Sequence, residues 1–317
     1  MVSMWVANTD PDWFDFLSAQ PNIDEVNFWQ PSGNATFRAI EPGELFLFKL
    51  KAPRNGIGGF GVLSQASNLP VSLAWEAMGT KNGAPSFVEM RERVSRYRRE
   101  QDNRSDYTIG CRIVVQPTFF PEHLWIPQPA SWSRETVVGK KYDTSDIEGM
   151  RLWESLQSTA ALVRQTAVPQ GDRVEEERLI YAPAPRYGRP ALVAPRLGQG
   201  AFRLGVTDAY RRECAISRGR VLPALDAAHI RPYGEGGEHE LSNGILLRRD
   251  IHRVFDAGYV TFDEDYRLVV SDRVRTDFNN GNEYRRLHGE TLSLPNIPSA
   301  APSQSALDWH RTQRFLG

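Results

Sequence analysis

Residues 226–259 read DAAHIRPYGEGGEHELSNGILLRRDIHRVFDAGY, and this stretch decides the fold of the C-terminal part of the chain. It holds three of the six histidines, an asparagine and several aspartates. VLPALDAAHI (221–230) is typical of a strand, a polar glycine-rich loop follows, ILLR is a second short strand, and RDIHRVFDAG has helical spacing. We expect Asp250 to cap this helix and Gly258 to end it.

On that helix, His252 and Asp256 stand at positions i and i+4 and therefore lie on one face. An imidazole and a carboxylate placed in this way can bind one divalent cation. The two short strands would pack against the helix and carry His229 opposite the metal. The sequence therefore predicts a strand, loop, strand and helix unit in which a base faces a metal ion.

The order His229, Asn243 and His252 resembles the H-N-H signature of the ββα-metal endonucleases. The surrounding RLGQGAFR, AYRREC, AAHIRPY, SNGILLR and IHRVFDAG support this resemblance, which covers about residues 196–260. It implies that His229 is the general base, that Asn243 holds the loop so that His229 points correctly, and that His252 ligates the metal. Asp256 stands where other members carry a further ligand.

One position departs from the family pattern. Many members have a ligating Asp or His directly before the base, whereas this chain has Ala228. Asp226 is two residues back on the same strand face and could substitute. His239, in the acidic loop, is expected to be solvated. The competing interpretation is that His229, Asn243 and His252 only form bonds within a small fold, or that the motif is a degenerate remnant.

Composition limits the metal chemistry. The chain has only two cysteines, far apart, so neither a disulfide framework nor a four-cysteine zinc ribbon can form. We expect a divalent ion, with Mg²⁺ or Mn²⁺ preferred for phosphoryl oxygens, although His252 would also accept Zn²⁺, Co²⁺ or Ni²⁺.

The N-terminal half has a different pattern. FRAIEPGELFLFKLKAPRNGIGGFGVL (37–63) is typical of turn, strand, turn and strand, and flanking segments with helical spacing would cover a β-barrel or curved sheet. GIGGFG (56–61) matches a dinucleotide-binding fingerprint, but no helix follows it, which favours a sharp bend or a close backbone approach at a barrel edge. The prolines near 181–200 favour an extended connection. We therefore expect a reader domain at 1–165, a linker at 166–195 and a nuclease domain at 196–317.

FWQPSG (28–33), EPGELFLFKL and IGGFGVL resemble the PUA superfamily, which includes the SRA and EVE readers of modified bases. The resemblance implies that a base is flipped into a pocket, stacked on aromatic rings and read along its edge. The candidates for the walls are Trp29, Trp75, Trp125 and Trp132, and the candidates for an edge contact are Asn82 and Asp106. The alternative for each tryptophan is a place in the barrel core. The predicted fold class is thus α+β: a PUA/SRA-like β-barrel with flanking helices, linked to a ββα-metal HNH nuclease domain.

The net charge of −1 gives no global attraction to nucleic acid, so the distribution of charge matters more. Residues 91–104, RERVSRYRREQDNR, hold six arginines against three acids. This run is either a solvated helix face or a surface that contacts phosphates. The residues predicted to contact the DNA backbone are Arg91, Arg93, Arg96, Arg98 and Arg248.

Together the halves resemble the modification-dependent SRA-HNH or EVE-HNH restriction endonucleases. That resemblance implies a metal-dependent phosphodiester hydrolase that cuts double-stranded DNA carrying 5-methylcytosine or 5-hydroxymethylcytosine. Two alternatives stay open: a binding protein for modified nucleic acid with a degenerate HNH domain, and an HNH nuclease that reads an unmodified sequence. One HNH site cuts one strand, so we expect a homodimer. The N-terminus lacks a secretory pattern and no apolar run approaches a membrane span, so we expect a cytoplasmic protein without membrane contact.

Overall fold

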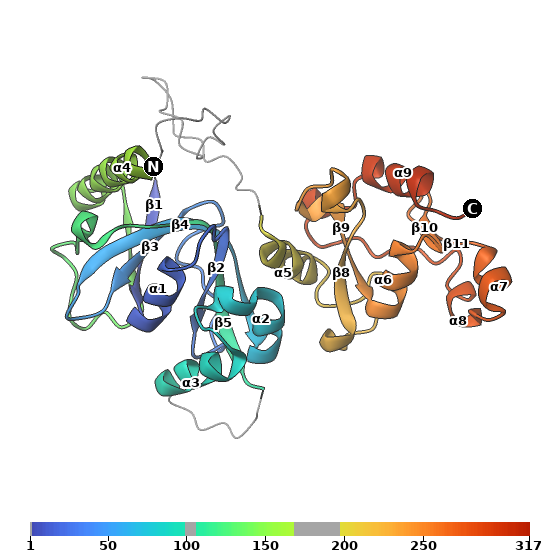
Figure 1. Cartoon of the computed structure of the whole chain (residues 1–317), viewed down its shortest axis with the longest axis horizontal. Helices are drawn as coiled ribbons and strands as arrows, with labels where there is room; N and C mark the ends of the chain where they lie inside the picture. The colour runs from blue at the N-terminus through green and yellow to red at the C-terminus, as the bar shows by residue number, and fades with distance from the viewer. Residues whose placement is uncertain (1, 99–105, 168–196) are drawn as a thin grey trace. The chain divides into compact units, whose positions relative to one another are not determined.

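The computed structural model describes residues 2–98, 106–167 and 197–317 (Figure 1). The chain divides into two compact units, Met1–Pro195 and Arg196–Gly317. The predicted linker at 166–195 lies outside the described residues except for its first two positions. Those two positions belong to the end of helix α4 (Ile147–Ala167).

A mixed sheet forms the first unit. Its strand order is β2-β5-β4-β3-β1-β7, with β6 paired to β4. Strands β1 and β3 are parallel and the other pairs are antiparallel. Because β2 and β7 end the path, the described strands form an open sheet and not a closed barrel. The strands are β1 (Ser3–Thr9), β2 (Glu25–Gln30), β3 (Leu45–Leu50), β4 (Gly56–Pro70), β5 (Thr108–Phe119), β6 (Ile126–Pro127) and β7 (Gly139–Asp143).

Strand β3, LFLFKL, is buried along its whole length. Its neighbour β4 contains the glycine-rich GIGGFG, which is therefore a strand and not a phosphate-binding loop. A Cβ on Gly59 would lie 2.4 Å from the carbonyl oxygen of Thr118, and one on Gly61 would lie 2.4 Å from Val114 Cγ1. The glycines thus allow β4 to approach β5 closely, as the sequence predicts.

Helices cover this sheet (Figure 1). Helix α1 (Pro11–Ser18) packs on β3, α2 (Val71–Met78) on β4 and β5, and α4 on β6 and β7. The N-terminus of α1 is capped by Asp10, which accepts a hydrogen bond from the Trp13 N–H at 3.2 Å. Helix α3 (Phe87–Tyr97) packs on α2. The α+β class predicted from the sequence is confirmed.

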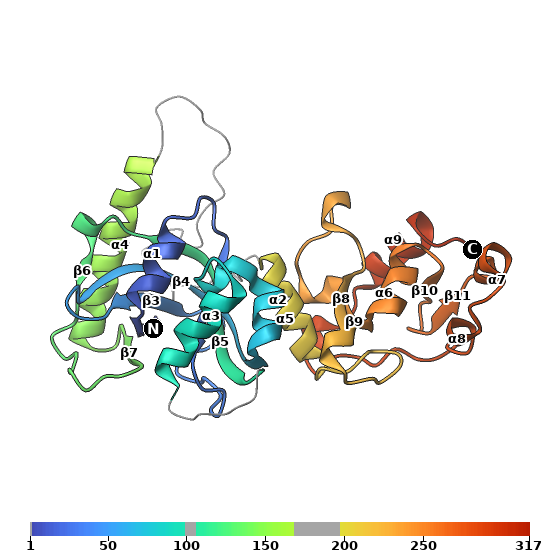
Figure 2. The same ribbon diagram turned by 60° about the horizontal axis from the view of Figure 1, so that its bottom comes forward.

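The second unit is built around the hairpin of β8 (Leu225–His229) and β9 (Gly244–Arg248). Helices α5 (Gln199–Ala209) and α6 (Arg249–Asp256) both pack on this hairpin (Figure 2). A core of buried aliphatic and aromatic side chains joins them. The remaining elements are β10 (Val260–Phe262), β11 (Leu268–Val270), α7 (Arg273–Phe278), α8 (Asn282–Arg285) and α9 (Gln304–Gln313).

Local details set the helix ends in the second unit, and the cap predicted at Asp250 is absent. Helix α5 stops at Ala209, because Arg211 and Arg212 adopt positive φ angles of 54° and 60°, which no helix continues. Asp250 lies in the first turn of α6, where its carboxylate binds Arg248 and does not cap the helix. Gly258, with φ of +79°, follows the end of α6 as expected.

Both cysteines are free thiols in buried positions, Cys111 in the first unit and Cys214 in the second. Within the described ranges, no helix is both long and apolar enough to cross a membrane.

Candidate functional sites

The first unit contains a cavity of about 1200 Å³. Trp29 and Tyr97 stand near each other on its wall, with ring centroids 6.4 Å apart at an interplanar angle of 41°. Residues from β1, β2, α3 and the segment before β7 line the cavity. The lining comprises Asn8, Asp10, Trp13, Phe28, Trp29, Gln30, Pro31, Ser32, Gly33, Asn34, Lys51, Arg96, Tyr97, Arg98, Asp106, Tyr107, Thr108, Arg134, Thr136, Val137 and Val138.

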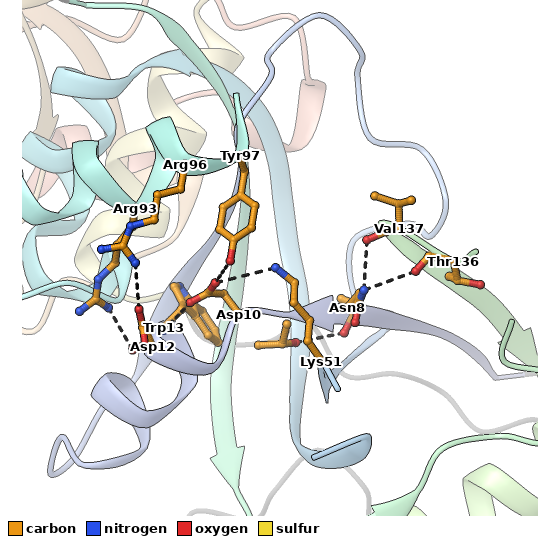
Figure 3. Close-up of polar contacts among 12 residues, drawn as sticks. Asn8, Asp10, Asp12, Trp13, Lys51, Arg93, Arg96, Tyr97, Thr136 and Val137 are labelled. Atoms are coloured by element: carbon orange, nitrogen blue, oxygen red, sulfur yellow. Dashed lines mark hydrogen bonds and ion pairs between the residues drawn. The ribbon is translucent and has the colours of Figure 1, made fainter. Parts of the chain in front are cut away.

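A polar cluster stands at this cavity (Figure 3). The Tyr97 hydroxyl donates a hydrogen bond to Asp10, and Lys51 Nζ lies 3.8 Å from the same carboxylate. Lys51 also lies over the Tyr97 ring, 3.9 Å from its centroid. Burial and the bond to Asp10 raise the pKa of Tyr97 to about 12, so its hydroxyl stays protonated at neutral pH.

Two of the predicted reader residues, Trp29 and Asp106, line the cavity. Trp29 is only 8% exposed, and its indole N–H donates to the Asn82 carbonyl oxygen at 3.0 Å. The Asp106 carboxylate accepts hydrogen bonds from the Ser72 N–H and hydroxyl. Both side chains are therefore partly engaged within the unit.

The other predicted reader residues lie elsewhere. Asn82 is fully buried, and its amide bonds Asn27 and the carbonyl oxygens of Ala74 and Gly79, which leaves it no free edge for a ligand. The three remaining tryptophans are half-buried and pack on neighbours outside the cavity lining. They are Trp75 against Phe87, Trp125 against Phe14, and Trp132 beneath Lys49.

The second unit has a smaller cleft of about 610 Å³ at one face of β8 and α6. His229 ends β8 within this cleft, and its ring stacks on Phe202 of α5 with centroids 3.8 Å apart. Its Nε2 lies 2.9 Å from Nδ1 of His239. Burial lowers the pKa of His229 to about 4, and the nearby His239 and His252 add to this shift. His229 is therefore neutral at pH 7 and able to accept a proton.

The loop that follows His229 is closed by Asn243, which is 7% exposed. Its Oδ1 accepts from the Arg231 N–H at 2.9 Å. Its Nδ2 donates to the carbonyl oxygens of Arg231 and Glu238, each at 2.9 Å. This amide, at the end of the loop, thus bonds backbone groups of Arg231 at its start and of Glu238 within it, and fixes the point where the chain leaves His229.

His252 of α6 lies between two carboxylates. Its Nδ1 is 3.2 Å from Asp226 Oδ2, and its Nε2 is 3.2 Å from Asp256 Oδ2. Burial opposes the charged form, but the hydrogen bonds to the two aspartates prevail and raise the pKa of His252 to about 9. Asp226 also lies 3.5 Å from Arg203 Nε. Burial disfavours its charged form, but His252 and Arg203 hold the pKa of Asp226 below its usual value.

This cluster can be compared with the needs of a divalent ion. Asp226 and Asp256 meet opposite nitrogens of one ring, and an imidazole nitrogen binds a single ion. Among the residues that the structure describes, no three His, Cys, Asp or Glu side chains are arranged around one metal position. His252 with one carboxylate supplies a nitrogen and an oxygen ligand. That pair fits a hard cation, which takes waters and phosphate oxygens for its other positions.

Residues 214–263 match the family model described as HNH endonuclease. This segment is therefore similar to the HNH endonucleases. It spans β8, the loop, β9 and α6, and it includes His229, Asn243 and His252. No curated protein matches the chain.

Two solved structures show a low likeness. The crystal structure of ASCH from Zymomonas mobilis has a TM-score of 0.32 and 10% identity, and the match covers 47% of this chain and 94% of that chain. The modification-dependent TagI restriction endonuclease has a TM-score of 0.30 and 12% identity, and the match covers 94% of this chain and 78% of that chain. At TM-scores this low, the two structures add no argument about function.

The predicted DNA-contacting arginines bind groups of their own unit. Arg248, beside the HNH site, pairs with Asp250 at 2.6 Å. In the first unit, Arg96 and Arg98 line the cavity, and Arg98 donates to the Pro31 carbonyl oxygen. Arg93 donates to the carbonyl oxygens of Asp12 and Gly83, and Arg91 lies over the Phe87 ring.

Sequence reasoning missed two residues. His239, assigned to a solvated loop, lies against His229, and the flat face of Tyr233 stacks on it with centroids 4.7 Å apart. The glycines of this loop let it fold back on His229, so they were the feature of the sequence that could have indicated this contact. Asn8 lines the cavity of the first unit, and nothing in its sequence context pointed to it.

Proposed function

We propose that the chain is a divalent-metal-dependent DNA endonuclease that recognises modified cytosine, 5-methylcytosine or 5-hydroxymethylcytosine, in double-stranded DNA. The observation that carries the nuclease part is the HNH match over 214–263, together with a neutral His229 in the same cleft as an imidazole held by two carboxylates.

His229 is the general base in this proposal. Phosphodiester hydrolysis needs a group that takes a proton from the attacking water. His239 engages Nε2 of His229, so Nδ1 is the nitrogen left to face that water. Phe202 holds the ring plane, and Asn243 fixes the loop that follows. His239 therefore acts as a positioning residue for His229.

We assign the metal to His252 and Asp256. Asp226 already pairs with Arg203, so the Asp256 side of the ring is the better ligand pair, and Asp226 would orient His252 through Nδ1. This assignment keeps Asp226 at the site but changes its predicted role from ligand to support. A bound divalent ion, Mg²⁺ or Mn²⁺ by preference, would neutralise charge on the phosphate and on the leaving oxygen.

The reader function rests on the cavity in the first unit. Aromatic rings suit the flat face of a flipped base, and the cationic side chains at the cavity suit its flanking phosphates. The domain limits of 1–165 for the reader and 196–317 for the nuclease remain part of this proposal. Because one HNH site cuts one strand, the active form is proposed to be a homodimer, which light scattering with and without DNA tests directly.

Cleavage of methylated and unmethylated DNA of identical sequence, with and without EDTA, tests the function. The expected result is cutting of the methylated DNA alone, abolished by EDTA. Equal cutting of both DNAs would favour a nuclease that reads an unmodified sequence. Binding without cutting at any divalent ion would favour a reader with a degenerate HNH domain.

A further inference from the structure

His310 on α9 is a buried histidine outside the segment that matches the HNH family model. Helix α9 packs on β10 (Figure 1), and the His310 side chain is 2% exposed. The matched segment ends at residue 263, well before α9. His310 nevertheless lines the HNH cleft together with His252 and Asp256. The proposed steps of hydrolysis give it no role.

Both ring nitrogens of His310 are hydrogen-bonded. Nε2 lies 3.1 Å from the Phe255 carbonyl oxygen, and Nδ1 lies 2.9 Å from the Thr261 hydroxyl. A carbonyl oxygen only accepts hydrogen bonds, so Nε2 carries the hydrogen and donates it to Phe255. Burial lowers the pKa of His310 to about 4, so the ring is neutral at pH 7 and Nδ1 accepts from the Thr261 hydroxyl. The ring therefore links α6 to β10 in one tautomer.

The same ring stacks on the side chain of Phe255. The two ring centroids are 3.8 Å apart, and the planes differ by only 4°. Phe255 is 0% exposed, so both rings are enclosed by the core of the second unit. Close packing of this kind leaves the two side chains little freedom to move. His310 thus holds Phe255 by its ring and by its carbonyl oxygen at once.

Phe255 directly precedes Asp256, the proposed metal ligand. The Phe255 carbonyl group belongs to the planar peptide unit that also contains the nitrogen and Cα of Asp256. It lies at the end of α6, where carbonyl groups lack partners within the helix. This oxygen accepts from the Gly258 N–H at 2.9 Å, and His310 supplies a second donor from another helix. The peptide unit that carries Asp256 is therefore anchored to α9.

The Asp256 side chain depends on that anchor because solvent surrounds much of it. It is 52% exposed, and its carboxylate lies 3.2 Å from His252 Nε2. An exposed side chain has few packed neighbours to hold it in one place, so its backbone sets where the carboxylate can reach. A shift in the last turn of α6 would change the spacing between this carboxylate and the imidazole.

We infer that His310 is a positioning residue for the metal site, which holds the last turn of α6 so that Asp256 and His252 can bind one ion together. The inference rests on the proposed function, in which these two side chains bind the divalent ion. It extends the site to α9, outside the matched segment. Because His310 would act only through a ligand, its loss should weaken metal binding and leave the reaction at saturating metal unchanged.

Two substitutions separate the two hydrogen bonds of His310. In His310→Gln, the amide nitrogen reaches the position of Nε2 and keeps the bond to Phe255. In His310→Asn, the shorter side chain places its oxygen at the position of Nδ1 and keeps only the bond to Thr261. Each variant loses the ring and one buried hydrogen bond, so thermal unfolding should show a similar loss of stability in both.

Calorimetric titration of the intact chain with Mn²⁺, without DNA, measures the metal affinity. His310→Asn should lower it about tenfold, the low end of the range for a group that supports a metal ligand, and His310→Gln should stay within about twofold of the unsubstituted protein. Single-turnover nicking at saturating Mn²⁺ should be the same in both variants. This pattern distinguishes positioning of the ligand from a general loss of stability.

Arg311→Met is the matched control on the same helix. Arg311 donates to the Phe262 carbonyl oxygen at 3.0 Å, so its loss loosens α9 from β10 and leaves Phe255 untouched. This variant should lose stability and keep its Mn²⁺ affinity. His310→Phe, which keeps a ring against Phe255 but neither hydrogen bond, replaces His310→Asn if that variant does not fold, and it should show the same tenfold loss.

Three results would overturn the inference and leave the proposed function intact. One is an unchanged Mn²⁺ affinity in His310→Asn. Another is an equal loss in His310→Gln, because the bond to Phe255 would then not matter. The third is an equal loss in Arg311→Met, which would show that docking of α9 is what counts. An unsubstituted protein that binds no Mn²⁺ would overturn the proposed metal site, and the inference with it.

Discussion

The two candidate sites satisfy their polar groups in opposite ways. In the HNH cleft each chemical side chain is held by another: His229 by His239 and Phe202, and His252 by two aspartates. In the cavity of the first unit the walls are aromatic, and Asn8 Oδ1 lacks a donor among the described residues. Chemistry on a common phosphodiester needs groups fixed in advance, whereas a cavity that takes up a ligand needs open space between its walls.

The largest effect that this contrast predicts is at His229. His229→Ala should lower the single-turnover nicking rate by on the order of 10²–10⁴-fold, because it removes the proton acceptor. DNA binding and metal affinity should stay unchanged, since Ala228 and Asn243 keep the strand and loop in place. A variant that nicks at the parental rate would remove His229 from the mechanism.

Metal affinity should distinguish the two carboxylates at His252, those of Asp256 and Asp226. Asp256→Ala removes a proposed ligand, so metal affinity should fall by about 10–100-fold, with activity partly restored at high metal concentration. His252→Ala should behave similarly. Calorimetric titration of Mn²⁺ gives the affinities.

Asp226→Ala provides the comparison for that experiment. A supporting role predicts a smaller loss of metal affinity than in Asp256→Ala, because the ligand nitrogen of His252 remains. The reverse order of the two aspartate variants would move the ion to the Asp226 side of the ring.

In the reader cavity, Trp29→Ala should weaken binding of modified DNA by about 1–3 kcal/mol, the range for loss of one stacking platform. Trp75→Ala is the matched control because Trp75 packs on Phe87 outside the cavity, and its effect should be near zero. Fluorescence anisotropy with modified and unmodified duplexes measures both variants. An equal loss of affinity for the two DNAs after Trp29→Ala would argue against a pocket role.

The smallest expected effect is that of pH on the base. A base works above its pKa, and burial lowers the pKa of His229 from 6.5 to about 4. At saturating metal, the single-turnover rate should therefore change by less than about twofold between pH 7.5 and 5.5. An unshifted histidine would lose about tenfold over the same interval. A rate that halves near pH 6.5 would show that the catalytic base is not buried as described.

The sequence could place the residues of the candidate HNH site near one another because they are local. His229, Asn243 and His252 fall within one hairpin and the helix that follows it, so spacing alone places them. The sequence could not predict the orientation of the His252 ring. The i,i+4 rule places His252 and Asp256 on a shared helix face, but it does not say which ring nitrogen each aspartate contacts. The position of His239 depends on how a glycine-rich loop folds back, which periodicity does not encode.

The cavity of the first unit could not be predicted in the same detail. Its lining comes from residues as far apart as Asn8 and Val138, brought together by the pairing of β1 with β3 and β7. The sequence indicated strands, helices and an aromatic content typical of such a cavity, and it placed Trp29 there. It could not show that the Asn82 amide is used by Asn27, Ala74 and Gly79, because those contacts exist only in the folded sheet and helix.

Each unit contains one buried thiol, and the rate at which that thiol is alkylated reports how often the unit opens. Cys111 is 1% exposed and Cys214 is 0% exposed, and they are the only cysteines in the chain. An alkylating reagent can reach either one only when its own unit opens. Mass spectrometry of the labelled peptides therefore measures how often the first unit and the second unit open, separately and in one sample. DNA that protects Cys111 alone would be bound through the reader, and a metal ion that protects Cys214 alone would be bound through the HNH segment.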